Sequence, residues 1–185
     1  RAPAGFVVAS NQLMLQFPEK KEPLMKKFPA LSLQETEKDY LISGKSFRMT
    51  FGKGDGGIIS WVVRGKEVVM NPLVPHFTRP LTDNDARCWK GDRFLKDWFE
   101  ARPAVQSMTF TRLGDGLISL EAHYSVIPGK AQATVRYTIN GNGVVKVDNK
   151  LSADPSLSDI PRIGMQCGIS RDLDRITWYG RGPLE

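Results

Sequence analysis

Residues that commonly build disulfide and metal sites are scarce in this sequence. Its 185 residues include two cysteines, Cys88 and Cys167, and two histidines, His76 and His123. Two cysteines without C-x-x-C spacing are too few for a disulfide framework, so we expect reduced thiols, one of them in a core strand. A structural zinc site is not expected either, because its ligands come in closely spaced Cys and His pairs.

Long apolar runs are missing as well. No run approaches the roughly 18–20 apolar residues that a membrane-spanning helix requires, so no membrane partner is expected. The chain starts with Arg-Ala-Pro-Ala-Gly instead of Met and has no apolar signal core there. We expect this start to be an internal cut, which leaves the cellular compartment open.

The sequence carries a formal net charge of +6, but its basic residues are not arranged for nucleic-acid binding. Lys and Arg are scattered along the chain, without the aromatic-basic stripe or recognition helix typical of such proteins. The basic cluster near the start is interleaved with acidic residues: Lys20, Lys21, Lys26 and Lys27 with Glu19 and Glu22. Nucleic acid is therefore not expected as a partner.

Alternating apolar residues and closely spaced turns dominate what the sequence does contain. Phe47, Met49 and Phe51 share one face of an extended segment, and later segments alternate in the same way. Asp115-Gly116 is a hairpin signal, and Asn140–Gly143 indicates a type I′-like turn. Without any strand–helix–strand alternation, this pattern predicts an all-β protein built as an antiparallel β-sandwich. The expected strands are residues 46–51, 58–63, 68–70, 105–112, 117–126, 131–139, 144–151, 163–169 and 176–179.

One segment departs from the strand pattern. Apolar residues at helical spacing predict one short amphipathic helix, from Arg87 or Gly91 to Glu100. Its apolar stripe, which we expect in the core, is Phe94, Leu95, Trp98 and Phe99. The glycine-rich run 52–57 is followed by a strand and not by a helix, so we interpret it as a chain reversal and not as a phosphate-binding loop.

The polar residues within 77–85 form the candidate site. Pro80 restricts the chain, and Asp83, Asn84 and Asp85 follow it directly before the predicted helix. Asx residues before a helix usually cap it, so we expect Asp83 and Asn84 to bind backbone N–H groups there. The run does not fit the Ca²⁺-binding loop, because Arg87 stands where the third ligand belongs, and no metal site is expected.

Two separated motifs carry a resemblance to a known family. They are Arg-Pro-Leu-Thr-Asp-Asn-Asp at 79–85 and Trp-Tyr-Gly-Arg-Gly-Pro-Leu-Glu at 178–185, in the right order. The chain resembles the C-terminal, small-chain domain (domain 5) of family 2 glycoside hydrolases, the β-galactosidases of the bacterial lactose-cleaving type. The resemblance implies the N-terminal part of a galactose-mutarotase-like supersandwich, whose second half we expect to be absent from this chain.

The resemblance also implies that the chain has three parts. Residues 1–17 correspond to the last strand of a preceding immunoglobulin-like domain, and residues 40–185 to the truncated supersandwich. Between them, residues 18–39 are rich in charge and contain Pro18, Pro23 and Pro29, which predicts an extended linker.

For function, the resemblance implies an enzyme that hydrolyses terminal β-galactosides with retention, through two glutamates of a (β/α)₈-barrel domain outside this chain. Asp83 and Asp85 lie on one loop and cannot easily flank a scissile bond from two sides. No catalytic residue is therefore expected here, and the isolated chain should be inactive. No cofactor is expected in this chain, and a divalent cation of the full-length enzyme would bind outside it.

In the family, the loop at this position lies near the mouth of the active site and helps shape its pocket. The rim residues expected from this loop are Arg79, Asp83, Asn84 and Asp85. Trp89 is added to the rim because it lies next to the loop and outside the apolar stripe, which makes it the better candidate for contact with a carbohydrate face. Many members have a mobile loop with a glycine one or two residues after the Asn-Asp pair. Here the run Ala86-Arg87-Cys88 has no glycine, so loop opening is not inferred.

The expected partners are the remaining domains of the parent enzyme and a galactoside substrate. Half a sandwich leaves strand edges without neighbours, so edge pairing with a second copy or marginal stability is also expected. Two alternatives stay open at this point. The chain could be an autonomous β-sandwich carbohydrate-binding module, or a structural interface module without a ligand.

Overall fold

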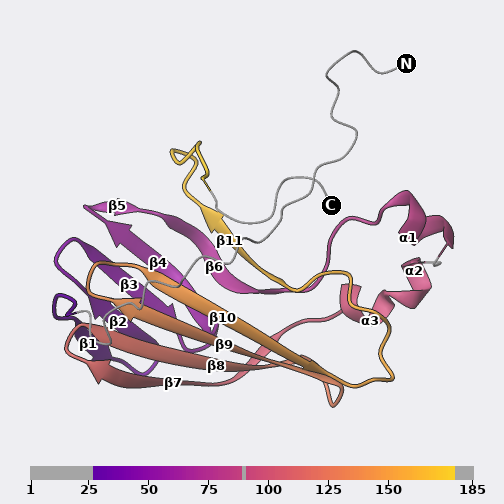
Figure 1. Ribbon diagram of the computed structural model, residues 1–185, viewed down its shortest axis with the longest axis horizontal. Coiled ribbons are helices and arrows are strands. Elements are labelled where there is room, and N and C mark those ends of the chain that lie inside the picture. The colour runs from indigo at the N-terminus through magenta and orange to yellow at the C-terminus, as the bar shows by residue number, and fades with distance from the viewer. Residues whose placement is uncertain (1–26, 89–90, 178–185) are drawn as a thin grey trace, which may run out of the picture. The chain divides into compact units, whose positions relative to one another are not determined.

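The computed structural model describes residues 27–88 and 91–177 (Figure 1). Residues 27–173 form one compact unit, and the described residues of the other unit, 174–177, have no helix or strand. The prediction of a strand over 176–179 is therefore wrong at its first two residues. Ile176 is largely exposed there, with no strand neighbour among the described residues. The strand predicted within residues 1–17 lies outside the described residues.

Antiparallel strands in three sheets make up the unit 27–173 (Figure 1). One sheet has the order β1-β2-β3-β4-β5, a second has the order β10-β9-β8-β7, and a third joins β11 to β6. The all-β prediction is confirmed. In chain order the strands are Ser32–Glu35, Asp39–Ser43, Phe47–Gly52, Gly57–Val63, Lys66–Glu67, Val69–His76, Ala104–Gly114, Leu117–Ile127, Ala131–Asn140, Val145–Ala153 and Gly164–Ile169.

The two larger sheets contribute to one apolar core, as in a β-sandwich. Alternate residues of β8 and β9 are buried, and Leu120 of β8 lies opposite Tyr137 of β9. The Tyr137 ring meets Phe51 of β3 edge to face, with ring centroids 5.3 Å apart. The intervening residues of β8 and β9 are polar or partly exposed, so one face of the four-stranded sheet forms the core and the other does not.

Two segments extend the sheets beyond the sequence prediction. β1 lies inside the predicted linker 18–39, because Leu31 is buried in the core and β1 pairs with β2 along its whole length. β6 continues to His76, past the expected end at residue 70, and contains Pro72 and Pro75. Proline is tolerated there because β6 pairs with β11 alone among the described strands, so the missing N–H groups interrupt no second ladder.

Three short helical segments replace the one predicted helix: α1 (Asp83–Cys88), α2 (Gly91–Phe94) and α3 (Lys96–Phe99). α1 begins before the predicted start at Arg87 or Gly91, within the segment expected to be a loop. The chain turns at Leu95 between α2 and α3, so the apolar stripe is not one continuous face. Leu95 and Trp98 are buried, but Phe94 and Phe99 are 47% and 37% exposed, contrary to the prediction that all four lie in the core. Cys167 lies in β11 but is exposed, and Cys88 ends α1, so the prediction of a cysteine in a core strand is wrong.

The turn between β9 and β10 differs from the predicted type. The side-chain oxygen of Asn140 accepts the N–H groups of Asn142 and Val144, at 3.0 and 3.2 Å. Gly143 has φ 84° and donates its N–H to the Asn140 carbonyl. A type I′ turn would require positive φ at Gly141 and Asn142, which neither adopts. The hairpin is therefore closed by an Asx turn and one left-handed glycine.

Residues 28–31 cross the turn ends of the hairpins β7–β8 and β9–β10. Leu31 donates its N–H to the Asp115 carbonyl at 2.8 Å, and Gly141 donates to Gly116 at 3.0 Å. A Cβ atom at Gly141 would overlap the Pro29 carbonyl oxygen. Glycine is required at this position because the backbone of the first described residues lies directly against the turn.

Substitution of this glycine tests the crossing. We expect Gly141→Ala to lower the free energy of unfolding by about 1–3 kcal/mol, because the backbone at Pro29 must move away from the new methyl group. Gly114→Ala is the matched control, since a Cβ there meets no atom within 4 Å, and it should change stability by less than about 0.5 kcal/mol. Urea denaturation followed by tryptophan fluorescence measures both. Equal effects of the two variants would contradict the close approach.

Candidate functional site

The candidate site follows β6, where the chain leaves the sheet and enters α1. Phe77, directly after β6, is buried and its ring lies 6.1 Å from that of Trp98 in α3. Trp98 in turn donates its indole N–H to the Ser158 carbonyl at 3.0 Å. Pro80 restricts Arg79 to an extended conformation, which keeps this part of the loop out of a helix. The loop 78–82 therefore starts at an anchored point, the end of β6, and leads into α1.

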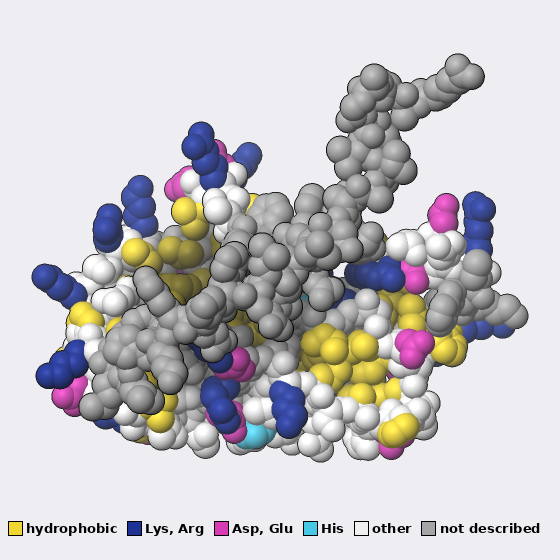
Figure 2. Space-filling view, viewed as in Figure 1, with side chains coloured by type: hydrophobic (Ala, Val, Ile, Leu, Met, Phe, Trp, Pro, Cys, Tyr) yellow, Lys and Arg dark blue, Asp and Glu magenta, His cyan; other side chains and the backbone are white. Residues whose placement is uncertain are grey.

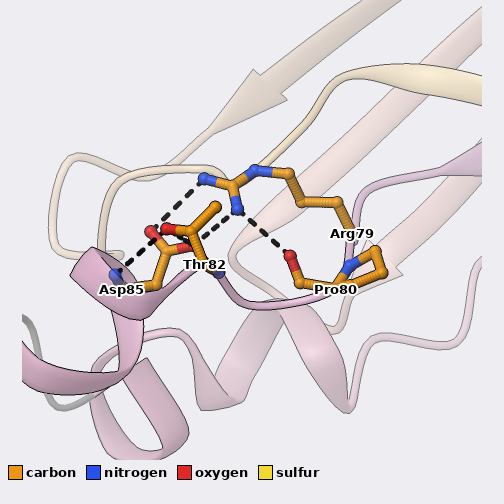
Figure 3. A network of polar contacts seen from close by, with 4 residues as sticks. All are labelled: Arg79, Pro80, Thr82 and Asp85. Atoms are coloured by element: carbon orange, nitrogen blue, oxygen red, sulfur yellow. Dashed lines mark hydrogen bonds and ion pairs between the residues drawn. The ribbon is translucent and has the colours of Figure 1, made fainter. Parts of the chain in front are cut away.

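A reciprocal pair of hydrogen bonds starts α1 (Figure 3). The Thr82 hydroxyl accepts the Asp85 N–H at 3.3 Å, and the Asp85 carboxylate accepts the Thr82 N–H at 2.8 Å. This is a capping box, with Asp85 in the place usually taken by Glu or Gln. The prediction that Asp83 and Asn84 cap the helix is wrong, because both already belong to the first turn of α1.

Arg79 holds the same carboxylate from the other side (Figure 3). Its Nη1 donates to Asp85 Oδ2 and to the Pro80 carbonyl, and its Nη2 donates to Asp85 Oδ1 at 3.3 Å. The Arg79 guanidinium and the N–H and hydroxyl of Thr82 lower the pKa of Asp85 to about 2. We call Arg79, Thr82 and Asp85 the Arg79–Asp85 brace. A carboxylate in this setting stays ionised at any pH near neutrality.

The structure divides the predicted rim residues into three groups. Arg79 and Asp85 bind each other, with 30% and 17% of their side-chain surfaces exposed. Asp83 and Asn84 are exposed on the first turn of α1. Trp89 lies outside the described residues. Thr82 was not among the predicted site residues, although the spacing Thr-x-x-Asp before a helix is the signal that identifies it.

Elsewhere, the outer face of the four-stranded sheet carries a shallow polar hollow. The ion pair between Arg136 and Glu121 crosses it from β9 to β8. Its lining is rich in hydroxyl and charged groups: Thr109, Thr111, Leu113, Ser119, Glu121, Arg136, Thr138, Lys146 and Asp148. The hollow lacks aromatic side chains, which usually provide the stacking surface for a sugar ring.

The described part of the chain contains no group of three or more His, Cys, Asp or Glu side chains placed to hold a metal ion. It also contains no helix long and apolar enough to cross a membrane.

Comparison with known proteins places this chain in a family. A family model described as β-galactosidase small chain matches residues 43–185. The chain belongs to the β-galactosidase small-chain family. Both sequence motifs of the small-chain domain, at 79–85 and 178–185, fall within the matched residues, although the second lies outside the described ones. The proposed boundary at residue 40 stays a prediction.

Individual relatives are named β-galactosidase and are much longer than this chain. The β-galactosidase of Priestia megaterium is 29% identical over 186 aligned residues, covering 100% of this chain and 18% of that protein. The β-galactosidase of Psychromonas ingrahamii is also 29% identical, over 100% of this chain and 19% of that protein. That of Clostridium acetobutylicum is 28% identical over 78% of this chain and 16% of that protein. The chain therefore spans about a fifth of the length of these curated relatives.

The ionisation of Asp85 is directly testable. Because its folded pKa of about 2 lies below the ordinary value of 3.8, the brace should stabilise the fold fully above about pH 4, and this stability should be lost as the pH falls through about 2. We expect Arg79→Ala to raise the pKa of Asp85 toward its ordinary value. Carbon-detected NMR titration of the carboxyl group measures it, with Arg93→Ala, an exposed arginine of α2, as control. A wild-type midpoint near 3.8 would refute the brace.

Proposed function

We propose that this chain is part of a β-galactosidase that hydrolyses terminal β-galactosides with retention of configuration, and that the chain itself is not catalytic. The observation that carries the proposal is the family match together with relatives named β-galactosidase that are about five times as long. The fold is consistent with this role, because residues 27–88 and 91–177 form packed antiparallel sheets and a loop with short helices, and no (β/α)₈ barrel.

The chemistry of the loop supports the absence of catalytic residues. Retaining glycosidases need two carboxyl groups about 5–5.5 Å apart on opposite sides of the scissile bond, one of them protonated to donate to the leaving group. Asp85 cannot fill the role of the acid, because Arg79 and Thr82 lower its pKa to about 2. Asp83 lies on the same helical turn and not across from it. The catalytic carboxylates are thus assigned to other domains of the parent enzyme.

The role left for the chain is to shape the pocket and to pack against other domains. In this proposal the loop with Arg79, Asp83, Asn84, Asp85 and Trp89 forms part of the pocket rim. Any divalent cation binds outside the chain.

The remaining domains, or a second copy that pairs through strand edges, cover exposed apolar side chains such as Met70, Ile163 and Ile169. Figure 2 shows hydrophobic side chains gathered beside the helices on one face, which supports contacts of this kind.

Hydrolysis of a chromogenic galactoside tests the assignment. We expect the full-length enzyme to hydrolyse o-nitrophenyl β-galactoside. NMR should show the β-anomer of galactose as the first product, as retention requires. The purified chain, at the same molar concentration, should show no turnover above the buffer rate. Turnover by the chain alone would refute the non-catalytic role, and release of α-galactose would refute retention.

Titration with sugar separates this proposal from a carbohydrate-binding module. Trp98 is buried and Trp61 is half-buried, so these two tryptophans offer no exposed platform on a sheet face. We therefore expect calorimetry of the isolated chain with lactose to show no binding up to millimolar concentration. Saturable binding in that range would favour the module instead.

A further inference from the structure

We propose that Arg79, Thr82 and Asp85 are positioning residues, which fix the direction of α1 relative to β6, and that none of the three contacts the galactoside. The inference rests on the proposed function, because it assigns roles within the proposed rim. It separates the rim residues that fix the position of the loop from the rim residues that the fixed loop leaves exposed.

The first argument is a count of hydrogen-bond acceptors. The two oxygens of Asp85 receive four hydrogen bonds: two from Arg79, one from the Thr82 N–H and one from the Thr82 hydroxyl. An ionised carboxylate has about four lone-pair sites. Three of these bonds reach Oδ2 and one reaches Oδ1, so a sugar hydroxyl could bind Oδ2 only by displacing one of its present donors, while Oδ1 keeps one lone pair besides its bond to Arg79. A carboxylate oxygen that must lose one of its present hydrogen bonds to accept a new one is poorly suited to bind substrate.

The second argument concerns Arg79. Its Nη1 already donates to Asp85 and to the Pro80 carbonyl, and its Nη2 donates to Asp85. The planar guanidinium is thereby fixed in a two-pronged contact with the carboxylate, the arrangement that gives Arg its geometric specificity. Three of the five N–H donors of Arg79 are used in these contacts, so turning the guanidinium toward a new partner would break the two-pronged contact. The orientation of the guanidinium is thus set by the loop.

The third argument is the length of α1. Six residues are too few for a helix to be stable by itself, so contacts outside the helix must set its direction. The brace joins Arg79, just after β6, to Asp85 inside α1, and Thr82 begins the helix between them. The brace therefore spans the joint where the chain changes direction, and its loss would leave the orientation of α1 undetermined.

Kinetics of the full-length enzyme on o-nitrophenyl β-galactoside test the roles. We expect Asp85→Ala to raise KM about tenfold with kcat within about twofold, because a misplaced rim weakens binding equally in the ground and transition states. Asp85→Glu should restore KM to within about twofold, since Thr-x-x-Glu is a regular capping box and keeps the charge for Arg79. Asp85→Asn, which retains an acceptor for the Thr82 N–H but loses the ion pair, should fall between them.

Gly141→Ala is the matched control for a purely structural effect. It perturbs the turn ends of the four-stranded sheet, opposite the end where α1 to α3 lie (Figure 1). It should lower stability without changing KM. If Asp85→Ala behaves like this control, with less active enzyme and an unchanged KM, the positioning role is overturned.

Each remaining outcome overturns either the positioning role or the proposed function. If Asp85→Glu damages KM as much as Asp85→Ala, the carboxylate touches the substrate directly and the inference is overturned. An enzyme that contains this chain but has no activity on galactosides overturns the proposed function and this inference together. An active enzyme whose KM is indifferent to Asp85 overturns this inference alone.

Discussion

The structure depends on the burial of Tyr137 between the sheets. Its ring, in β9 of the four-stranded sheet, meets Phe51 in β3 of the five-stranded sheet, and its hydroxyl donates to the Leu73 carbonyl in β6 of the third sheet. Burial raises the pKa of Tyr137, so the hydroxyl stays protonated and keeps donating. One side chain thus provides apolar area to one neighbouring sheet and a directional bond to another, which fixes where β6 lies.

The position of β6 determines where the candidate loop can lie. Beyond β6, Phe77 packs against Trp98 of α3, and Trp98 is bonded to the loop after β10 through Ser158. Phe77 holds one end of residues 78–82 and the Thr82–Asp85 hydrogen bonds hold the other, so the Arg79–Asp85 brace sets the angle at which α1 follows. The path from the core to the candidate rim therefore contains no long unsupported segment among the described residues. A rim that helps to shape a substrate pocket needs support of this kind, since small displacements weaken the fit.

The sequence predicted the elements whose pattern is local and left out those that depend on distant partners. Strands β3, β4 and β7 to β10 were predictable because alternation along each strand reports one buried face. β1 was not predicted because it is short and mostly polar and depends on pairing with β2, and the length of β6 was not predicted because of Pro72 and Pro75. The loop itself was found through its residues, but its internal bonds were not. Arg79 reaches Asp85 across Pro80, and no periodicity reports such a contact.

The direction of the Asp85 pKa shift also bears on which chemistry the loop can support. An acid that protonates a leaving group near neutral pH needs its pKa raised, usually by an apolar pocket. Asp85 lies in the opposite environment, because a guanidinium and two donors from Thr82 stabilise its charge. Changing it into an acid would require removal of the contacts that begin α1. The same bonds that build the loop therefore remove Asp85 from acid–base catalysis, so in this segment structural support and catalysis exclude each other.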